Sequence, residues 1–221
     1  MEWKKEITNL EDKQRIAKKI ASKVEDGDVI GFGSGSTSYV TILEIAKKIK
    51  NEKINIVAIP TSIEIEMVCE DLKIPVASIR AKTPDWCFDG ADEVDNSNNL
   101  IKGRGAAMFR EKLNICQSKK TFILIDKSKQ VDKLGKKFPV PVECSINSVK
   151  YVKSELEKIG AQKVEIRMAK EKDGPVISEN GNIILDTRFN DITENLEKQI
   201  KSITGVIESG LFIGYNVEIV K

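Results

Sequence analysis

The sequence predicts an α/β protein, with a Rossmann-like parallel sheet that carries helices on both faces and a small α+β (ferredoxin-like) domain. In the first part of the chain, short apolar or β-branched runs alternate with helix-like stretches, as in a covered parallel sheet. After residue 126 the chain becomes polar and basic, and a β-α-β-β-α order follows. We expect the larger domain to comprise residues 1–132 and 206–221, and the small domain residues 133–205.

Each element of the larger domain is predicted from its apolar pattern and its flanking residues. Apolar runs closed by glycine or rich in β-branched residues indicate strands, and apolar positions repeated on one helical face indicate helices. Pro60 precedes Thr61 and Ser62, either of which is a suitable N-cap for a helix. The expected strands are 28–33, 54–59, 76–79, 86–88 and 121–126, and the expected helices are 36–50, one beginning after residue 60, and 105–118.

Prolines and glycines mark the small domain. Residues 127–137 are expected to form a connection, and Pro139 and Pro141 keep the following segment extended. Gly160 ends the next predicted helix. The expected elements are an extended segment 138–142, helices 149–159 and 192–203, strands 162–168 and 182–186, and a strand-like tail 205–221 that returns to the larger domain.

The composition excludes several classes of protein. Lys and Arg number 36 and Asp and Glu 34, and this near-balance argues against a nucleic-acid or membrane partner. No apolar run approaches the roughly 20 residues of a membrane span, and residues 1–6 lack the apolar core of a secretory signal. The four cysteines form no C-x-x-C pair and are expected to be reduced core residues. We therefore expect a cytoplasmic protein.

The sequence contains no histidine, which restricts the available chemistry. Ser-His-Asp and Cys-His catalytic sets and histidine-based zinc sites are excluded. Any acid–base chemistry must use Asp, Glu, Lys, Tyr or Cys.

The first glycine loop (residues 33–37) is the first candidate site, because it joins a predicted strand to a helix. Its residues are Gly33, Ser34, Gly35, Ser36 and Thr37. Backbone N–H groups, hydroxyls and a helix N-terminus together suit a phosphate. The loop is not a Walker A loop, and it departs from the dinucleotide fingerprint at Ser36, where a third glycine would fall. A tight turn with Ser36 as an ordinary N-cap is the alternative.

Four carboxylates lie within residues 89–95, directly after a predicted strand. Ligands of open α/β sheets collect at the carboxyl ends of strands. Three interpretations are open: a solvated loop, a divalent-cation site, or carboxylates that accept hydrogen bonds from a polyol such as a sugar.

Glu111 is the third candidate, on the helix predicted to follow Gly105. It falls between Ala107 and Ile115 on the helical wheel. A carboxylate with apolar neighbours tends to have a raised pKa, which suits a general base near neutral pH. The alternative is a surface carboxylate paired with Arg104 or Lys112.

Together these motifs resemble those of the type A family of ribose-5-phosphate isomerases, in order and over nearly the whole chain. The matching motifs are Gly33-Ser34-Gly35-Ser36-Thr37, Pro60-Thr61-Ser62, Asp89-Gly90-Ala91-Asp92-Glu93, Lys102-Gly103-Arg104-Gly105, Arg110-Glu111-Lys112, Asp126-Lys127-Ser128-Lys129, Phe138-Pro139-Val140-Pro141-Val142-Glu143 and Gly210-Leu211-Phe212. This sequence departs from the family at Ser34, where threonine is usual, and at Arg104, which interrupts a run of glycines.

The resemblance implies an aldose–ketose isomerase of the non-oxidative pentose phosphate pathway. Such an enzyme interconverts D-ribose 5-phosphate and D-ribulose 5-phosphate through an enediolate, with no metal and no cofactor. It implies that Glu111 is the base that moves a proton between C1 and C2, and that Asp89 and Lys102 are further catalytic residues. The implied substrate-binding residues are Lys13, Ser34, Gly35, Ser36, Thr37, Asp89, Gly90, Ala91, Asp92, Lys102, Gly103, Arg104, Gly105 and Lys129.

The resemblance also implies a catalytic larger domain and a homo-oligomer, dimer or tetramer, with the small domain at a subunit interface. The alternative without catalysis is a sugar-phosphate-sensing effector domain of a repressor, but the sequence shows no basic recognition helix. Coenzyme A transferases also use a glutamate, yet their motifs are absent. Related deaminases and lactonases depend on a histidine, which this chain lacks.

Overall fold

The computed structural model describes residues 7–221, so the expectation about a signal segment in residues 1–6 lies outside the described residues. The chain divides into two compact units. The parallel-sheet unit comprises the described residues up to Gly90, Arg110–Ser128 and Asn216–Lys221, and the antiparallel-sheet unit comprises Ala91–Phe109 and Lys129–Tyr215. Within residues 7–221, no helix combines the length and the apolar character that a membrane span needs.

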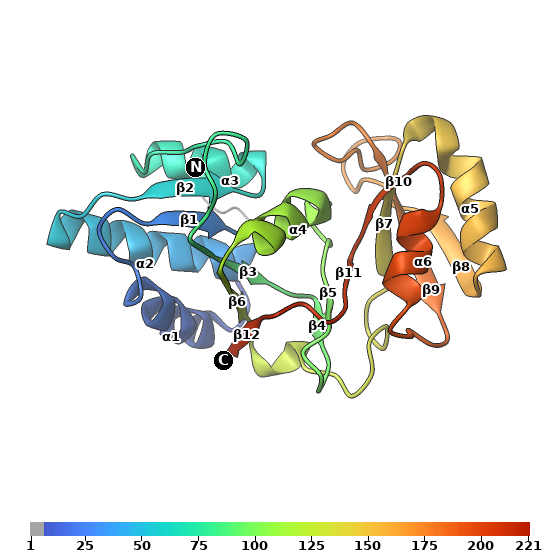
Figure 1. Cartoon of the computed structure of the whole chain (residues 1–221), viewed down its shortest axis with the longest axis horizontal. Coiled ribbons are helices and arrows are strands. Elements are labelled where there is room, and N and C mark those ends of the chain that lie inside the picture. Colours follow the sequence, from blue (N-terminus) through green and yellow to red (C-terminus); the bar gives the residue numbers. More distant parts are fainter. Residues whose placement is uncertain (1–6) are drawn as a thin grey trace. The chain divides into compact units, whose positions relative to one another are not determined.

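Five parallel strands form the sheet of the parallel-sheet unit, in the order β12-β6-β3-β1-β2. The strands are β1 (Val29–Phe32), β2 (Val57–Pro60), β3 (Trp86–Gly90), β6 (Lys120–Leu124) and β12 (Glu218–Val220), and the helices are α1 (Leu10–Ala21), α2 (Ser36–Glu52), α3 (Ile63–Asp71) and α4 (Met108–Gln117). The connection through α2 runs toward one sheet edge, whereas those through α3 and α4 run toward the other. Because such crossovers are right-handed, α2 covers one face and α3 and α4 the opposite face (Figure 1). The predicted Rossmann-like sheet is confirmed.

Apolar side chains from strands and helices meet in the core of this unit. Ile30 and Phe32 of β1 are fully buried and belong to one cluster with Ile16 and Ile20 of α1. The Phe32 and Phe88 ring centroids lie 5.1 Å apart, which joins β1 to β3. Burial of such side chains stabilises the sheet by about 2 kcal/mol each.

Several predicted elements of this unit differ in extent from the observed ones. The run 54–59 becomes a strand only from Val57, and the segment 76–79 contributes only an isolated bridge between Val76 and Ala58. The N-cap prediction for α3 is confirmed at Ser62, whose hydroxyl accepts a hydrogen bond from Ile65 N–H. Helix α1 was not predicted, because its apolar face is a narrow stripe among lysines.

The antiparallel-sheet unit contains a four-stranded sheet in the order β10-β7-β9-β8 and a three-stranded sheet in the order β11-β5-β4. The strands are β4 (Glu93–Val94), β5 (Leu100–Ile101), β7 (Val140–Cys144), β8 (Ala161–Ile166), β9 (Ile183–Phe189), β10 (Val206–Ser209) and β11 (Leu211–Phe212), and the helices are α5 (Val149–Lys158) and α6 (Leu196–Ser202). Short 3-10 turns, η1 (Lys127–Lys129) and η2 (Ile146–Ser148), complete the chain. The order β7-α5-β8-β9-α6-β10 is the βαββαβ arrangement of a ferredoxin-like fold, as predicted.

The compact units do not follow the expected boundaries. The tail was expected to return to the larger domain from residue 206, but β10 pairs with β7 and β11 pairs with β5, so only β12 joins the parallel sheet. Residues 91–109 belong to the antiparallel-sheet unit because β4 and β5 pair with each other and β5 pairs with β11. Two-residue strands of this kind carry too little pattern to be predicted from sequence.

The four cysteines are free, and all but Cys116 are buried. Desolvation, with smaller contributions from the charges of Glu66 and Glu70, raises the pKa of Cys69 to about 12. Desolvation and the charge of Glu143 likewise raise the pKa of Cys144 to about 11. These two thiols therefore stay protonated at neutral pH.

Candidate active site

The first glycine loop lies at the point in the parallel sheet where the chain direction changes. The connection that leaves β1 runs to one side and the one that leaves β3 runs to the other, so the switch point, where open α/β sheets bind their ligands, lies between the carboxyl ends of β1 and β3. Here Gly33 lies directly against Asp89 of β3: a Cβ added at Gly33 would lie 2.5 Å from Asp89 Cα. Only glycine fits, and the close approach brings the loop and the carboxylate to one place.

The N-terminus of α2 follows this loop, beside a buried lysine. Gly35 at its N-cap has φ 89°, which suits glycine, and it gives no side-chain cap to the first N–H groups. Lys13 of α1 is 5% exposed, and its Nζ donates to Ser36 Oγ over 2.9 Å. A cation and an uncapped helix N-terminus both attract a phosphate. Lys13 therefore contacts this loop directly, through Ser36.

The hydroxyl of Ser34 is engaged by the turn between β2 and α3. Ser34 Oγ lies 2.7 Å from Thr61 Oγ1 and donates to Ser62 Oγ over 2.9 Å. Thr61 Oγ1 in turn donates to the carbonyl of Phe32. The motif of residues 60–62 therefore supports the loop from the neighbouring strand, a role that the sequence analysis did not assign to it.

Two buried carboxylates belong to the same unit. Asp89 lies near the end of β3, is 2% exposed, and accepts a hydrogen bond from Gly90 N–H through Oδ1 over 2.7 Å. Glu111 is 5% exposed and lies in the first turn of α4. One turn further along this helix, Asn114 Nδ2 donates to the carbonyl of Ile59 over 3.0 Å, which fixes α4 against β2.

The second glycine loop (residues 102–105) lies in the antiparallel-sheet unit. Lys102 is 2% exposed; its backbone N–H donates to the carbonyl of Gly210, and its Nζ lies 5.9 Å from the centroid of the Phe212 ring. Gly103 has φ 97°, and a Cβ there would lie 2.8 Å from Met108 Cε. Residues 210–212 thus contact Lys102 through its backbone and its side chain, and the sequence alone did not predict these contacts.

Two carboxylates of the acidic run 89–95 accept hydrogen bonds from backbone N–H groups. Glu93 is fully buried and accepts hydrogen bonds from the backbone N–H groups of Gly135, Lys137 and Phe138. Asp95 accepts from backbone N–H groups of its own turn. Within residues 7–221, no three His, Cys, Asp or Glu side chains are grouped to hold a metal ion.

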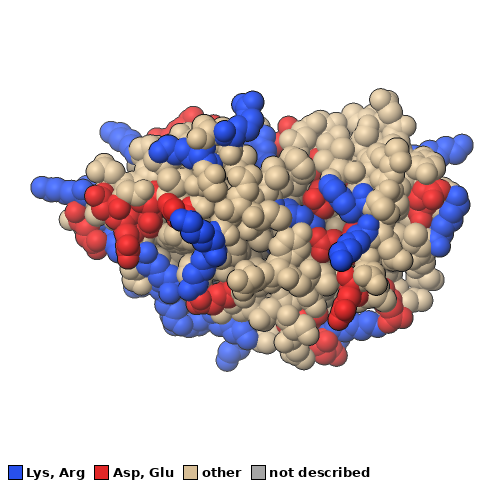
Figure 2. Space-filling view, in the orientation of Figure 1, with Lys and Arg blue, Asp and Glu red and all other residues tan. Residues whose placement is uncertain are grey.

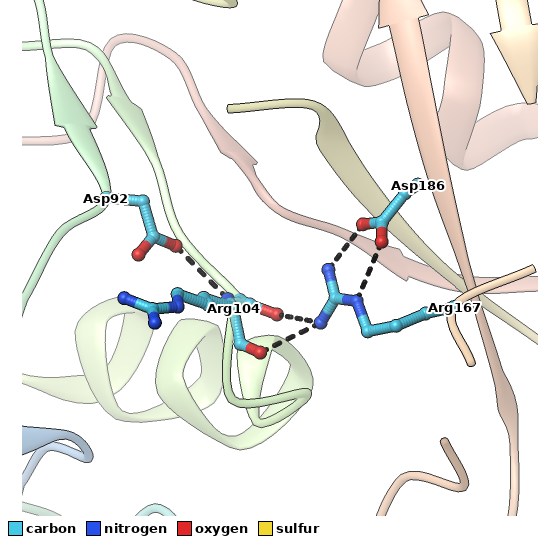
Figure 3. A network of polar contacts seen from close by, with 5 residues as sticks. Asp92, Arg104, Arg167 and Asp186 are labelled. Atoms are coloured by element: carbon cyan, nitrogen blue, oxygen red, sulfur yellow. Dashed lines mark hydrogen bonds and ion pairs between the residues drawn. The ribbon is translucent and has the colours of Figure 1, made fainter. Parts of the chain in front are cut away.

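The remaining predicted site residues have the following contacts. Asp92 Oδ2 accepts a hydrogen bond from the backbone N–H of Arg104 over 3.1 Å, while the Arg104 side chain is exposed and points away from Arg167 (Figure 3). Lys129 Nζ lies 5.3 Å from the centroid of the Phe138 ring. Gly90 and Ala91 continue the chain from Asp89 to Asp92, where the two units meet in sequence.

A parallel sheet whose switch point lies beside a helix N-terminus, a buried lysine and buried carboxylates is typical of α/β proteins that bind small polar ligands. A family model described as ribose 5-phosphate isomerase A (phosphoriboisomerase A) matches residues 57–221. The chain therefore belongs to the ribose 5-phosphate isomerase A family.

Individual relatives agree with this assignment. The chain is 42% identical over 205 residues to ribose-5-phosphate isomerase A of Thermosynechococcus vestitus, covering 91% of this chain and 86% of the relative. It is 43% identical over 209 residues to that of Pyrococcus horikoshii, with 92% and 91% covered. The solved structure of the Methanocaldococcus jannaschii enzyme superposes with a TM-score of 0.92 at 37% identity, covering 97% of this chain and 96% of that one. A D-ribose-5-phosphate isomerase in complex with phospho-erythronic acid gives 0.91 at 39% identity, with the same coverage.

Proposed function

We propose that this protein interconverts D-ribose 5-phosphate and D-ribulose 5-phosphate by proton transfer through an enediolate. Membership of the family supports the substrate. The observation that carries the chemistry is the buried Glu111 carboxylate, held in the first turn of α4 directly after the second glycine loop. In a chain without histidine, a fixed and shielded carboxylate is the natural base for this reaction.

The substrate phosphate binds at the N-terminus of α2. Lys13, the N–H groups of the first glycine loop and the hydroxyls of Ser36 and Thr37 supply positive charge and donors there. One solved relative holds phospho-erythronic acid, a phosphorylated sugar acid, which supports a site of this kind. Binding energy from the phosphate positions the reacting carbons at the other end of the substrate.

Glu111 moves the proton. Its carboxylate takes the proton from C2 of the open-chain aldose, the C–H electrons form the C1–C2 double bond, and the carbonyl electrons move to O1. The O2 proton then passes to O1, and Glu111 returns its proton to C1 to give the ketose. One carboxylate thus serves both carbons. Its partners Asp89 and Asp92 accept hydrogen bonds from the sugar hydroxyls, and Asp89 assists ring opening.

The negative charge that develops on the enediolate oxygens needs donors fixed in advance. Lys102 and the backbone N–H groups of the second glycine loop supply them in this proposal. Gly35, Gly90, Ala91, Gly103 and Gly105 contact the substrate through their backbone, and Lys129 adds a cation. Arg104 completes the second glycine loop at the substrate, with its own N–H held by Asp92 and its carbonyl by Arg167. The parallel-sheet unit contributes the base and the phosphate site, so we retain the assignment of the larger domain as catalytic.

The reaction needs no metal in this proposal, because Glu93 and Asp95 are committed to backbone N–H groups. The test is turnover of ribose 5-phosphate before and after exhaustive dialysis against EDTA, together with a panel of other pentose and hexose phosphates. We expect full activity after dialysis and a preference for ribose 5-phosphate. Activity that disappears and returns with Mg²⁺ or Mn²⁺ would contradict the metal-free mechanism, and binding without turnover would favour an effector domain.

We further propose a cytoplasmic homo-oligomer, dimer or tetramer, with no nucleic-acid or membrane partner. On the face drawn in Figure 2, Lys and Arg are interspersed with Asp and Glu, which fits the near-zero net charge. Sedimentation of the purified protein measures the assembly, and a monomer under assay conditions would contradict it.

A further inference from the structure

One side chain, which follows directly after β8, contacts the second glycine loop through two successive carbonyl groups. Arg167 Nη1 donates to the carbonyl oxygens of Gly103 and Arg104, each over 2.9 Å (Figure 3). All three residues belong to the antiparallel-sheet unit. No motif marked Arg167, which lies 63 and 64 residues further along the sequence than its two partners.

Asp186 fixes the direction of this guanidinium. Its two carboxylate oxygens accept from Arg167 Nε over 2.9 Å and from Nη2 over 2.5 Å, so the pair is bidentate. The two side chains are 16% and 25% exposed, which shields the pair from solvent more than a surface ion pair. The Arg167 backbone is fixed as well, since its N–H donates to Ile184 and its carbonyl accepts from Val176.

Because the peptide group is planar, holding a carbonyl also fixes the direction of the next N–H group. In a trans peptide the N–H points opposite to the carbonyl of the preceding residue. Because Arg167 holds the carbonyls of Gly103 and Arg104, the N–H groups of Arg104 and Gly105 face away from it. The Arg104 N–H reaches Asp92 Oδ2, whereas the Gly105 N–H makes no hydrogen bond to any of residues 7–221.

We propose that Arg167 is a positioning residue for the isomerase reaction, which fixes the second glycine loop so that the Gly105 N–H is aimed at the oxygen that becomes charged in the enediolate. Asp186 orients Arg167, and Asp92 holds the neighbouring peptide from the other side. This inference rests on the proposed function. Four of the five guanidinium N–H groups are used, in a planar arrangement that a lysine ammonium cannot reproduce.

The test compares Arg167→Lys, Arg167→Ala and Asp186→Asn with the unmodified protein in ribose 5-phosphate turnover. Removal of one donor to an oxyanion costs about 100-fold to 1,000-fold in kcat, so a loosened donor is expected to cost roughly 10-fold to 100-fold. We expect this loss in kcat for both Arg167 variants, with KM changed less than about threefold, because the phosphate site is untouched. Asp186→Asn keeps one acceptor and is expected to lose less.

Chemical rescue separates positioning from a merely structural role. Guanidinium added at about 10–50 mM should restore part of kcat in Arg167→Ala and none in Arg167→Lys, whose side chain still occupies the position. The matched control is Lys163→Met in β8, just before Arg167; it removes an exposed ion pair with Glu165 and should leave kcat within about twofold.

The outcomes are distinguishable. If the unmodified protein does not isomerise ribose 5-phosphate, the proposed function fails and this inference with it. If it does, but Arg167→Lys keeps kcat within threefold, or loses activity through KM alone, only the inference is overturned. Should Arg167→Ala fail to fold, Arg167→Lys, which retains the charge opposite Asp186, still decides the question.

Discussion

The first and second glycine loops carry most of the proposed substrate contacts, and different kinds of neighbour hold them. The first loop is fixed by the sheet from which it emerges: Gly33 packs against Asp89 on the adjacent strand, and Ser34 reaches the turn after β2. The second loop emerges from a two-residue strand. Besides backbone bonds from Lys102 N–H to Gly210 and from Ala106 N–H to Gly103, it is held by two side chains: Arg167 donates to its carbonyls, and Asp92 accepts from one N–H.

Because the two loops are held differently, we expect them to bind different groups of the substrate. A loop packed into a parallel sheet has little freedom and suits a constant group such as a phosphate. A loop held through its peptide groups presents oriented N–H donors, which suit charge that appears only during the reaction. Changes at the first loop should therefore act mainly on KM, and changes at the second mainly on kcat.

Glu111→Gln should have the largest effect, because it removes the carboxylate that we propose as the base. The amide keeps the size of the side chain and cannot accept the C2 proton. We expect kcat for ribose 5-phosphate to fall at least about 100-fold. Binding of a non-reacting pentose phosphate, measured by calorimetry, should survive. Near-normal turnover would show that another group is the base.

Gly33→Ala tests whether the first loop is held by close packing. The new Cβ would lie 2.5 Å from Asp89 Cα, so the loop or the strand must shift. We expect kcat/KM to fall between about 10-fold and 100-fold and the free energy of unfolding to fall by about 1–3 kcal/mol.

Gly105→Ala is the matched control for Gly33→Ala. A Cβ at Gly105 meets nothing within 4 Å, and its backbone φ is not positive. This substitution should leave the free energy of unfolding within about 0.5 kcal/mol, measured by urea denaturation. Equal destabilisation by the two variants would contradict the packing argument.

Lys13→Met should separate the phosphate site from the chemistry. It removes the ammonium that donates to Ser36 at the start of α2. A charge-assisted hydrogen bond is worth about 1.5–3 kcal/mol, so KM is expected to rise about 10-fold or more while kcat changes little. Lys18→Met, which removes an exposed lysine from the same helix, should change neither constant. A loss confined to kcat would place Lys13 in the chemistry instead.

The two loops also differ in how far the sequence predicts them. The first loop follows a clear apolar strand and consists of glycines and hydroxyls, so its position follows from residues 28–37, whereas its contacts with Lys13, Thr61 and Asp89 come from distant parts of the sequence. The ferredoxin-like unit was predicted in outline, but β10 was assigned to the wrong sheet, because a tail strand carries no sign of its partner. The resemblance implies the roles of Glu111 and Lys102, which we retain as a proposal.

The supports of the second loop could not be predicted. Arg167 lies just after an edge strand among alternating charged residues, where it resembles any solvated side chain. Its partner Asp186 and its targets lie 19 and 63–64 residues away in sequence, so only the folded chain brings them together. Glu93 likewise appears in sequence as part of an acidic run, yet it is fully buried as the acceptor of three backbone N–H groups.

Arg104→Gly should have the smallest effect and bears most directly on how the second loop works. Arg104 stands where relatives carry glycine, according to the resemblance, yet both of its peptide groups are engaged: the N–H with Asp92 and the carbonyl with Arg167. Its side chain is exposed, and removing it leaves those contacts in place. We expect kcat/KM to change by less than about tenfold, or roughly 1.4 kcal/mol of barrier. The added freedom of a glycine costs about 0.5–1 kcal/mol at most. A larger loss, seen mainly as a rise in KM, would mean that the guanidinium itself grips the substrate, and the loop would then act through a side chain as well as through its backbone.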